Sequence, residues 1–180
     1  GKGTKYLPEY HYSTPDTVWD YYGFTQEQLA TGDFNPKMFN SFLDGTKSAI
    51  EMAAVANGTG LTPQDEGLQF TPVGVDDLPQ LLKERERGGT LTRRGTVELI
   101  SSLNRDGSEV YRDLRWGVYV TFEARTDYAV QCFAEYGVRT DDSGRYGALY
   151  RPYHMIGLEL PVSIASAVLR GEPTGSPTGF

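Results

Sequence analysis

Residues 36–57 constrain the fold more than any other part of the sequence. The stretch follows Asn35 and opens with Pro36, which are typical of a helix cap and of a first helical residue. Asn57 and Gly58 favour a left-handed stop at its other end, and no further proline lies between. The apolar residues recur at helical spacing. We therefore predict one long helix over residues 36–57.

The two faces of this predicted helix differ in chemistry. When the stretch is plotted at about 100° per residue, one narrow sector is polar. It contains Asn40, Asp44, Lys47 and Glu51, with Lys37 beside it. The opposite face suits packing on a sheet and carries Met38, Phe42, Ala49, Met52, Ala53 and Ala56. The spacing allows Asp44 to reach Lys47, and Lys47 to reach Glu51.

This polar stripe has two interpretations, a solvated face with weak ion pairs or a preorganised site. We favour a site because a solvent-exposed face is usually crowded with Lys and Glu. This stripe instead carries one amide, one Asp, one Lys and one Glu beside small residues. Gly45 inside a helix costs roughly 0.8–1 kcal/mol relative to alanine, so we expect another group to approach the backbone there.

The composition is that of a globular, soluble and acidic protein. Its 180 residues include 17 Lys and Arg against 24 Asp and Glu, which gives a formal net charge of −7. This balance disfavours nucleic acid and anionic membrane surfaces as partners. No stretch approaches the ~20 apolar residues that cross a bilayer. The one cysteine, Cys132, excludes an internal disulfide, and we expect a cytoplasmic protein.

Patterns after residue 97 predict a sheet covered by helices. Residues 118–123 alternate as a strand with one buried and one more polar face, and residues 127–136 have helical spacing. A further strand is expected near 146–150, and a last helix from about Tyr153 to Leu169. We expect an α+β fold with a mixed or antiparallel sheet. Residues 1–172 are predicted to form one domain, and residues 173–180 a linker.

Other candidate residues lie outside the long helix. Arg151 and His154 stand where a strand meets the last helix, as an anion site or as a helix-cap cluster. Lys5 is either an anion ligand or a surface residue. The chain has too few Cys and His for a zinc site, whereas a hard cation held by Asp44 or Glu51 is left open. Neither GxSxG, GxGxxG nor a P-loop occurs, which disfavours nucleophilic catalysis and a nucleotide site of the Rossmann type.

Several long segments resemble the central domain of homoserine-dehydrogenase-like oxidoreductases. They are GKGTKYLPEYHYSTPDTVW, NPKMFNSFLDGTKSAIEMAAVANGTGL, DLRWGVYVTFEA, SGRYGALYRPYHMIGLELP and LRGEPTG. More narrowly, they resemble the branch with 1-deoxy-D-xylulose 5-phosphate reductoisomerase-like, SAF-domain-containing proteins. The resemblance implies an N-terminal Rossmann domain and a C-terminal domain outside this sequence. It also implies that this domain supplies the catalytic side chains and the contact of a homodimer or higher oligomer.

The function implied by the resemblance uses NADPH or NADH, bound mainly by the other domain. The reaction would reduce, or reductively isomerise, a small phosphorylated sugar-like carbonyl. One candidate is the conversion of 1-deoxy-D-xylulose 5-phosphate to 2-C-methyl-D-erythritol 4-phosphate in isoprenoid biosynthesis. Lys47 would protonate the carbonyl oxygen, Asp44 would orient Lys47, and Asn40 and Glu51 would complete the polar wall. The substrate's anionic group would meet Lys5, Lys37, Arg151 or His154.

Two alternatives remain beside this function. Homoserine dehydrogenases carry an Asp and a Lys four residues apart, whereas Asp44 and Lys47 are three apart. This departure favours the reductoisomerase-like branch over reduction of a homoserine-type hydroxy-aldehyde. A non-catalytic regulatory or assembly domain, with the polar stripe as a subunit contact, is the third hypothesis.

Overall fold

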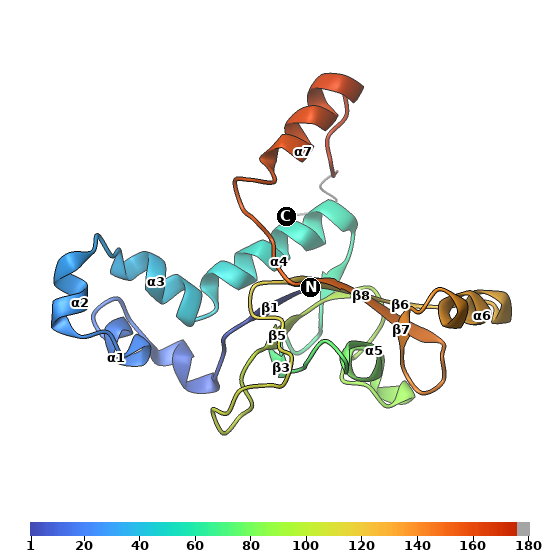
Figure 1. Cartoon of the computed structure of the whole chain (residues 1–180), viewed down its shortest axis with the longest axis horizontal. Coiled ribbons are helices and arrows are strands. Elements are labelled where there is room, and N and C mark those ends of the chain that lie inside the picture. Colours follow the sequence, from blue (N-terminus) through green and yellow to red (C-terminus); the bar gives the residue numbers. More distant parts are fainter. Residues whose placement is uncertain (176–180) are drawn as a thin grey trace.

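The computed structural model describes residues 1–175, which are built around one mixed sheet of six strands (Figure 1). The strand order is β3-β5-β1-β6-β8-β7. The strands are β1 Lys2–Thr4, β3 Thr71–Pro72, β5 Leu99–Ser101, β6 Val118–Glu123, β7 Arg139–Thr140 and β8 Tyr146–Arg151. A separate two-stranded sheet pairs β2 Thr62–Pro63 with β4 Thr96–Val97. The pairs β1–β5 and β3–β5 are parallel, and the pairs β1–β6, β6–β8 and β7–β8 are antiparallel. The predicted α+β class is therefore confirmed.

Helices pack on part of each face of the sheet. They are α1 Val18–Tyr22, α2 Gln26–Thr31, α3 Pro36–Leu43, α4 Thr46–Thr59, α5 Leu78–Leu81, α6 Asp127–Glu135 and α7 Leu160–Ala165, with short helical turns η1 Pro8–Tyr12, η2 Arg85–Arg87 and η3 Ser166–Arg170. Successive side chains of a strand point to opposite faces. Leu99 accordingly packs in a cluster with Met52 of α4, and the next residue, Ile100, packs in a cluster with Leu78 of α5. In Figure 1, α4 lies above the sheet and α5 below it.

The predicted single helix over residues 36–57 is wrong, because the chain forms two helices with a break at Asp44 and Gly45. Gly45 has a φ of 86°, a left-handed conformation that glycine adopts at little cost. A Cβ on Gly45 would lie 3.2 Å from Cζ of the buried Phe70 ring. The close approach expected at Gly45 is thus confirmed, but it ends one helix and starts another.

Replacing Gly45 by alanine is expected to lower the free energy of unfolding by about 1–2 kcal/mol. The cost arises because an L-residue is strained at this φ, and the new methyl group also presses on Phe70. Urea denaturation of the two proteins measures the difference. Gly58→Ala is a matched control, because Gly58 lies in α4 with open space around its missing Cβ. The control should gain roughly 0.5–1 kcal/mol. Equal stability of the two variants would contradict the proposed strain.

The apolar alternation in β6 suggests that Val120 is buried and that Tyr119 faces solvent, but the structure shows the reverse. Tyr119 points into the core and is 9% exposed, and the Thr121 hydroxyl donates to Leu82 O at 3.0 Å. Val120 and its partner on β8, Leu149, are instead 53% and 57% exposed. The sheet therefore presents apolar side chains on an uncovered face.

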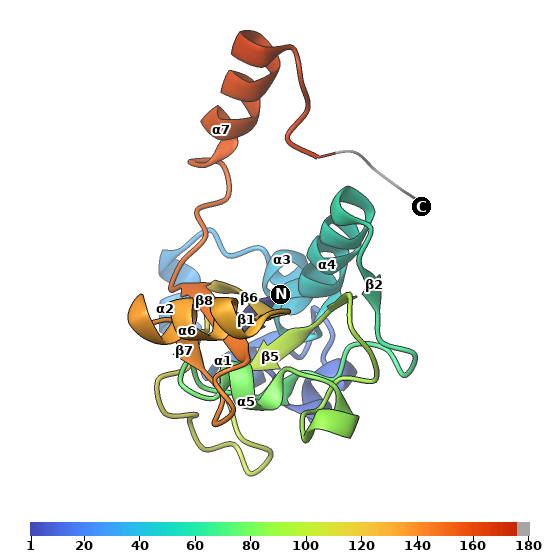
Figure 2. The same ribbon diagram turned by 90° about the vertical axis from the view of Figure 1, so that its right-hand side faces the viewer.

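A second exposed apolar surface follows β8. The predicted last helix begins only at Leu160, with Pro161 in its first turn, where the missing N–H of proline costs no hydrogen bond. Figures 1 and 2 show α7 and η3 projecting from the body of the molecule. We call residues 155–170 the C-terminal arm, and its exposed apolar side chains are Met155, Ile156, Leu158, Leu160, Val162, Ile164, Val168 and Leu169.

Of the predicted linker 173–180, residues 176–180 lie outside the described residues. Within residues 1–175, no helix has both the length and the hydropathy that crossing a membrane requires.

Candidate active site

A pocket of about 760 Å³ lies between α4, the start of β6 and the segment after β8, and we call it the α4 pocket. Its polar lining consists of Lys2, Ser41, Thr46, Lys47, Glu51 and His154. Its apolar lining includes Ile50, Val55, Val118 and Ile156. This volume is typical of ligand pockets, in which apolar walls surround a few polar groups.

Glu51 is the centre of the charged groups in this pocket. It forms a close ion pair with Lys2, its Oε1 lies 3.6 Å from Lys47 Nζ, and its Oε2 lies 3.9 Å from His154 Nε2. Lys2 is 9% exposed and Lys47 is 38% exposed. Lys47 Nζ also lies 4.5 Å from the centroid of the Phe42 ring. One carboxylate therefore holds a buried ammonium and an accessible one.

His154 is held by the backbone at the pocket wall. Its Nδ1 lies 2.9 Å from Trp116 O, and because a carbonyl oxygen only accepts, Nδ1 carries the proton. Nε2 is buried without a hydrogen-bond partner, and so is Oε1 of Glu51. Buried polar atoms are nearly always hydrogen-bonded in native proteins. These two atoms are thus available to a molecule in the α4 pocket.

Asn40 and Asp44 stabilise the turn between α3 and α4 instead of lining the pocket. Asn40 Nδ2 donates to Asp44 Oδ2 at 3.0 Å, and the Thr46 N–H donates to Asp44 Oδ1 at 2.8 Å. Within residues 1–175, no ion pair joins Asp44 to Lys47. The expected single stripe of four residues is corrected to two pairs, because the break at Gly45 turns α4 away from the line of α3.

Of the four predicted substrate-binding residues, only His154 lines the α4 pocket. Arg151 Nη1 lies 2.5 Å from Glu159 Oε1, and its guanidinium lies over the Tyr153 ring. Lys37 is exposed in the first turn of α3. Lys5 is half-buried beyond the end of β1. Neither Lys37 nor Lys5 lines the α4 pocket.

Lys2 is the charged pocket residue that sequence reasoning missed. It lies in β1 between two glycines, and a Cβ on Gly3 would lie 1.7 Å from Leu114 O. Because these glycines have no side chains, another segment of the same chain passes close to β1. Lys2 supplies the one long side chain of residues 1–3. A lysine flanked by glycines in an extended segment was the signal available in the sequence.

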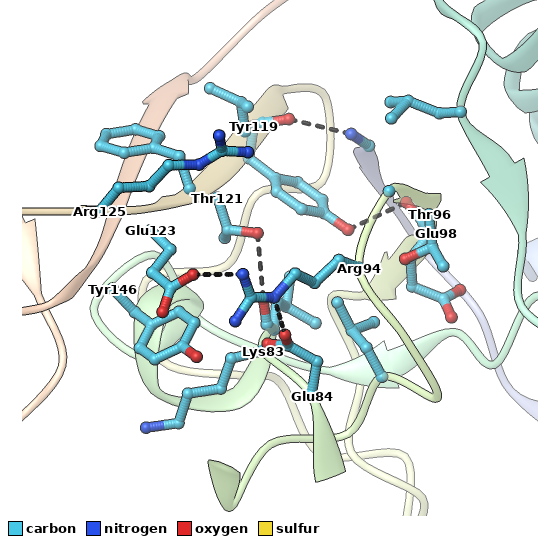
Figure 3. Close-up of a pocket in the computed structure, with 17 residues that line it drawn as sticks. Lys83, Glu84, Arg94, Thr96, Glu98, Tyr119, Thr121, Glu123, Arg125 and Tyr146 are labelled. Carbon is cyan, nitrogen blue, oxygen red and sulfur yellow. Dashed lines mark hydrogen bonds and ion pairs between the residues drawn. The ribbon is translucent and has the colours of Figure 1, made fainter. Parts of the chain in front are cut away.

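A second pocket, of about 400 Å³, lies on the other side of Tyr119, and we call it the β6 pocket (Figure 3). Arg94 forms a close ion pair with Glu84, and its Nη1 lies 2.6 Å from Glu123 Oε2. Lys83 Nζ lies 2.7 Å from Asp141 Oδ2, and both side chains are buried. None of the predicted site residues lines this pocket.

Two buried groups between these pockets have raised pKa values. Burial raises the pKa of the Glu98 carboxyl, although N–H groups of Leu99 and Gln69 and the side chain of Gln64 oppose the shift. Burial, assisted by the charge of Glu98, raises the pKa of Tyr119 well above its ordinary value. The Tyr119 hydroxyl donates to Glu98 O at 3.0 Å. Tyr119 thus remains a neutral wall between the two pockets.

No metal centre is evident, since residues 1–175 contain no group of three or more His, Cys, Asp and Glu side chains placed to hold an ion. The open question of a hard cation at Asp44 or Glu51 receives no support from the contacts of their carboxylates, which are with Asn40, Thr46, Lys2, Lys47 and His154.

Comparison with known protein families supplies the deciding observation. A family model described as "Oxidoreductase DRL, catalytic domain" matches residues 1–160. The chain belongs to this family. The DRL match includes Lys2, Lys47, Glu51 and His154, so the whole charged cluster of the α4 pocket lies inside it. The predicted oxidoreductase catalytic domain is confirmed at this level. No curated protein matches the chain.

Proposed function

We propose that this DRL catalytic domain reduces, or reductively isomerises, a small phosphorylated sugar-like carbonyl compound in the α4 pocket. The conversion of 1-deoxy-D-xylulose 5-phosphate to 2-C-methyl-D-erythritol 4-phosphate is a reaction of this class. The observation that supports the proposal is the Glu51 cluster, in which one carboxylate faces two ammonium groups. The excess positive charge favours an anionic substrate, because a phosphate group is stabilised by nearby cations.

Lys47 is the proposed general acid. Its ammonium is accessible in the pocket wall, whereas that of Lys2 is nearly buried against Glu51. Lys47 would donate a proton to the carbonyl oxygen as the carbonyl carbon receives a hydride, so that the C=O double bond becomes C–H and O–H. Glu51 would keep the ammonium in place, and His154 Nε2 would accept a hydrogen bond from a substrate hydroxyl. Asn40 and Asp44 are positioning residues that hold the start of α4.

The proposed hydride donor is NADPH or NADH. When bound, a nicotinamide ring would supply the hydride, and the apolar side chains of Ile50, Val55, Val118 and Ile156 would pack against it. This chain carries no GxGxxG or P-loop motif. We therefore assign the rest of the nucleotide to a separate Rossmann domain of the intact protein.

The assay that tests this function measures NADPH and NADH oxidation by the intact protein with separate carbonyl substrates. We expect oxidation with 1-deoxy-D-xylulose 5-phosphate or a related phosphorylated ketose, and no oxidation with the same sugar lacking phosphate. Preference for aspartate semialdehyde, the substrate of homoserine-type reduction, would favour the alternative enzyme. The absence of oxidation with every carbonyl tested would favour a regulatory or assembly domain.

The proposed quaternary state is a homodimer or a higher oligomer. The uncovered sheet face of Val120 and Leu149 and the C-terminal arm expose large apolar side chains, a feature that often marks an interaction site. A second copy of the chain that buries this surface would remove it from water. Sedimentation of the intact protein should give at least twice the monomer mass, and a monomer at all concentrations would contradict the proposal.

A further inference from the structure

We infer that the β6 pocket is a second ligand site, which binds a small polyhydroxylated anion such as a sugar phosphate or a sugar acid. This site does not rest on the proposed function of the α4 pocket. The walls of the two pockets share only Gly1 and Tyr119. A volume of about 400 Å³ is sufficient for a ligand of this size.

Most charged groups of the β6 pocket are already paired. Arg94 bridges Glu84 and Glu123, as the dashed lines in Figure 3 show, and the ammonium of Lys83 is held by Asp141. These contacts fix the wall of the pocket. Arg94 also orients the carboxylate oxygens of Glu84 and Glu123, whose side chains are 16% and 21% exposed. Such oxygens accept hydrogen bonds from hydroxyl groups.

Three other groups of the pocket have no partner. Arg125 is exposed and makes no hydrogen bond or ion pair within residues 1–175. The hydroxyl oxygens of Tyr146 and Thr96 are buried without a hydrogen-bond partner, and Tyr146 is only 8% exposed. All three line the pocket, and Figure 3 shows them on different sides of it. Leaving a hydroxyl buried and unpaired is costly, so a bound molecule that pairs with it is stabilised.

These groups define the chemistry of the ligand. The free guanidinium of Arg125 provides a planar set of donors that matches a phosphate or carboxylate. The hydroxyls of Tyr146 and Thr96 both donate and accept, and the carboxylates of Glu84 and Glu123 accept. A molecule with one anionic group and several hydroxyl groups satisfies all of them. An uncharged polyol lacks the group for Arg125, and an anion without hydroxyls leaves Tyr146 and Thr96 unpaired.

Isothermal titration calorimetry on the intact protein tests the site with ribose 5-phosphate, gluconate, ribose and inorganic phosphate. We expect one of the first two to bind at least about tenfold more tightly than ribose or inorganic phosphate. Tighter binding of ribose 5-phosphate assigns the anion as a phosphate, and tighter binding of gluconate assigns it as a carboxylate. Failure of both to bind overturns the proposal.

Three variants assign the binding to the β6 pocket. Arg125→Ala is expected to weaken binding by about tenfold or more, and Tyr146→Phe by about threefold to tenfold. Tyr146→Phe should retain or raise the melting temperature, since it removes an unpaired hydroxyl. Lys47→Ala should leave the binding that depends on Arg125 and Tyr146 unchanged, which separates this site from the α4 pocket. Binding that survives Arg125→Ala and Tyr146→Phe, or that is lost in Lys47→Ala, would refute the assignment.

Discussion

Replacing Lys47 by alanine in the intact protein is expected to lower turnover by about 100-fold or more. The loss would follow from removing the proposed proton donor to the carbonyl oxygen, because the hydride step would then leave an unprotonated alkoxide. The substitution should not unfold the domain. Lys47 is partly exposed, and its contacts are an ion pair of 3.6 Å with Glu51 and a ring contact with Phe42.

Two further variants distinguish proton donation from simple attraction of an anion. Lys47→Arg keeps the positive charge but donates a proton poorly, so kcat should fall while KM changes little. Lys37→Ala removes an exposed lysine of α3 outside the pocket and should leave both values unchanged. Turnover of Lys47→Ala close to that of the natural protein would remove Lys47 from the mechanism. A rise in KM with normal kcat would assign it to substrate binding alone.

The largest expected effect on stability comes from the buried ion pair of Lys83 and Asp141. Their side chains are 7% and 3% exposed, and Nζ lies 2.7 Å from Oδ2. Lys83→Ala would leave the carboxylate of Asp141 buried without its cation. We expect the free energy of unfolding to fall by about 3–5 kcal/mol, a change that urea denaturation measures directly.

An exposed ion pair and a double substitution serve as controls for this explanation. Arg85→Ala breaks an ion pair with Glu66 in which both side chains are at least half exposed, so the loss of stability should be far smaller than that of Lys83→Ala. Replacing Lys83 by Met and Asp141 by Leu together removes both charges, and much of the lost stability should return. A similar cost for Arg85→Ala and Lys83→Ala would show that burial does not set the energy of the pair.

The same pair gives stability a specific dependence on pH. Burial disfavours ionisation of Asp141, but hydrogen bonds from Lys83, Ser143 and the Tyr146 N–H outweigh it and lower the pKa. Because the unfolded state then binds the proton more tightly, the pair's contribution is present above the unfolded pKa of about 4. It is lost as the pH falls through the folded pKa. The stability difference between the natural protein and Asp141→Asn should therefore shrink on acidification.

Local patterns in the sequence predicted the elements whose signals are complete within a few residues. The strand at 118–123, the helix that begins at Asp127 and the strand near Tyr146 are all confirmed. Each has alternating or helical spacing and a clear stop. The break at Gly45 could not be read in the same way, because an interior glycine is tolerated in many helices. The ring of Phe70, distant in sequence, decides the conformation there.

The candidate site was predicted only in part, for a related reason. Lys47 and Glu51 are one helical turn apart, so their pairing follows from local spacing. Lys2 joins them through sheet pairing with Leu99 and Val118, which no local pattern indicates. The β6 pocket likewise combines residues that lie far apart in the sequence, from Gly1 to Tyr146.

The place of β1 in the middle of the sheet also determines when the α4 pocket can form during folding. Lys2 pairs with Leu99 and Val118, so β1 is enclosed only after two very long loops have closed. Contacts between residues so distant in sequence slow the folding of a domain. The backbone hydrogen bonds of the helices α4 and α6 are local and can form earlier. The Glu51 cluster needs Lys2, so it cannot be complete before β1 is paired. A partly folded chain would present α4 and Lys47 without the arrangement that we propose for substrate binding.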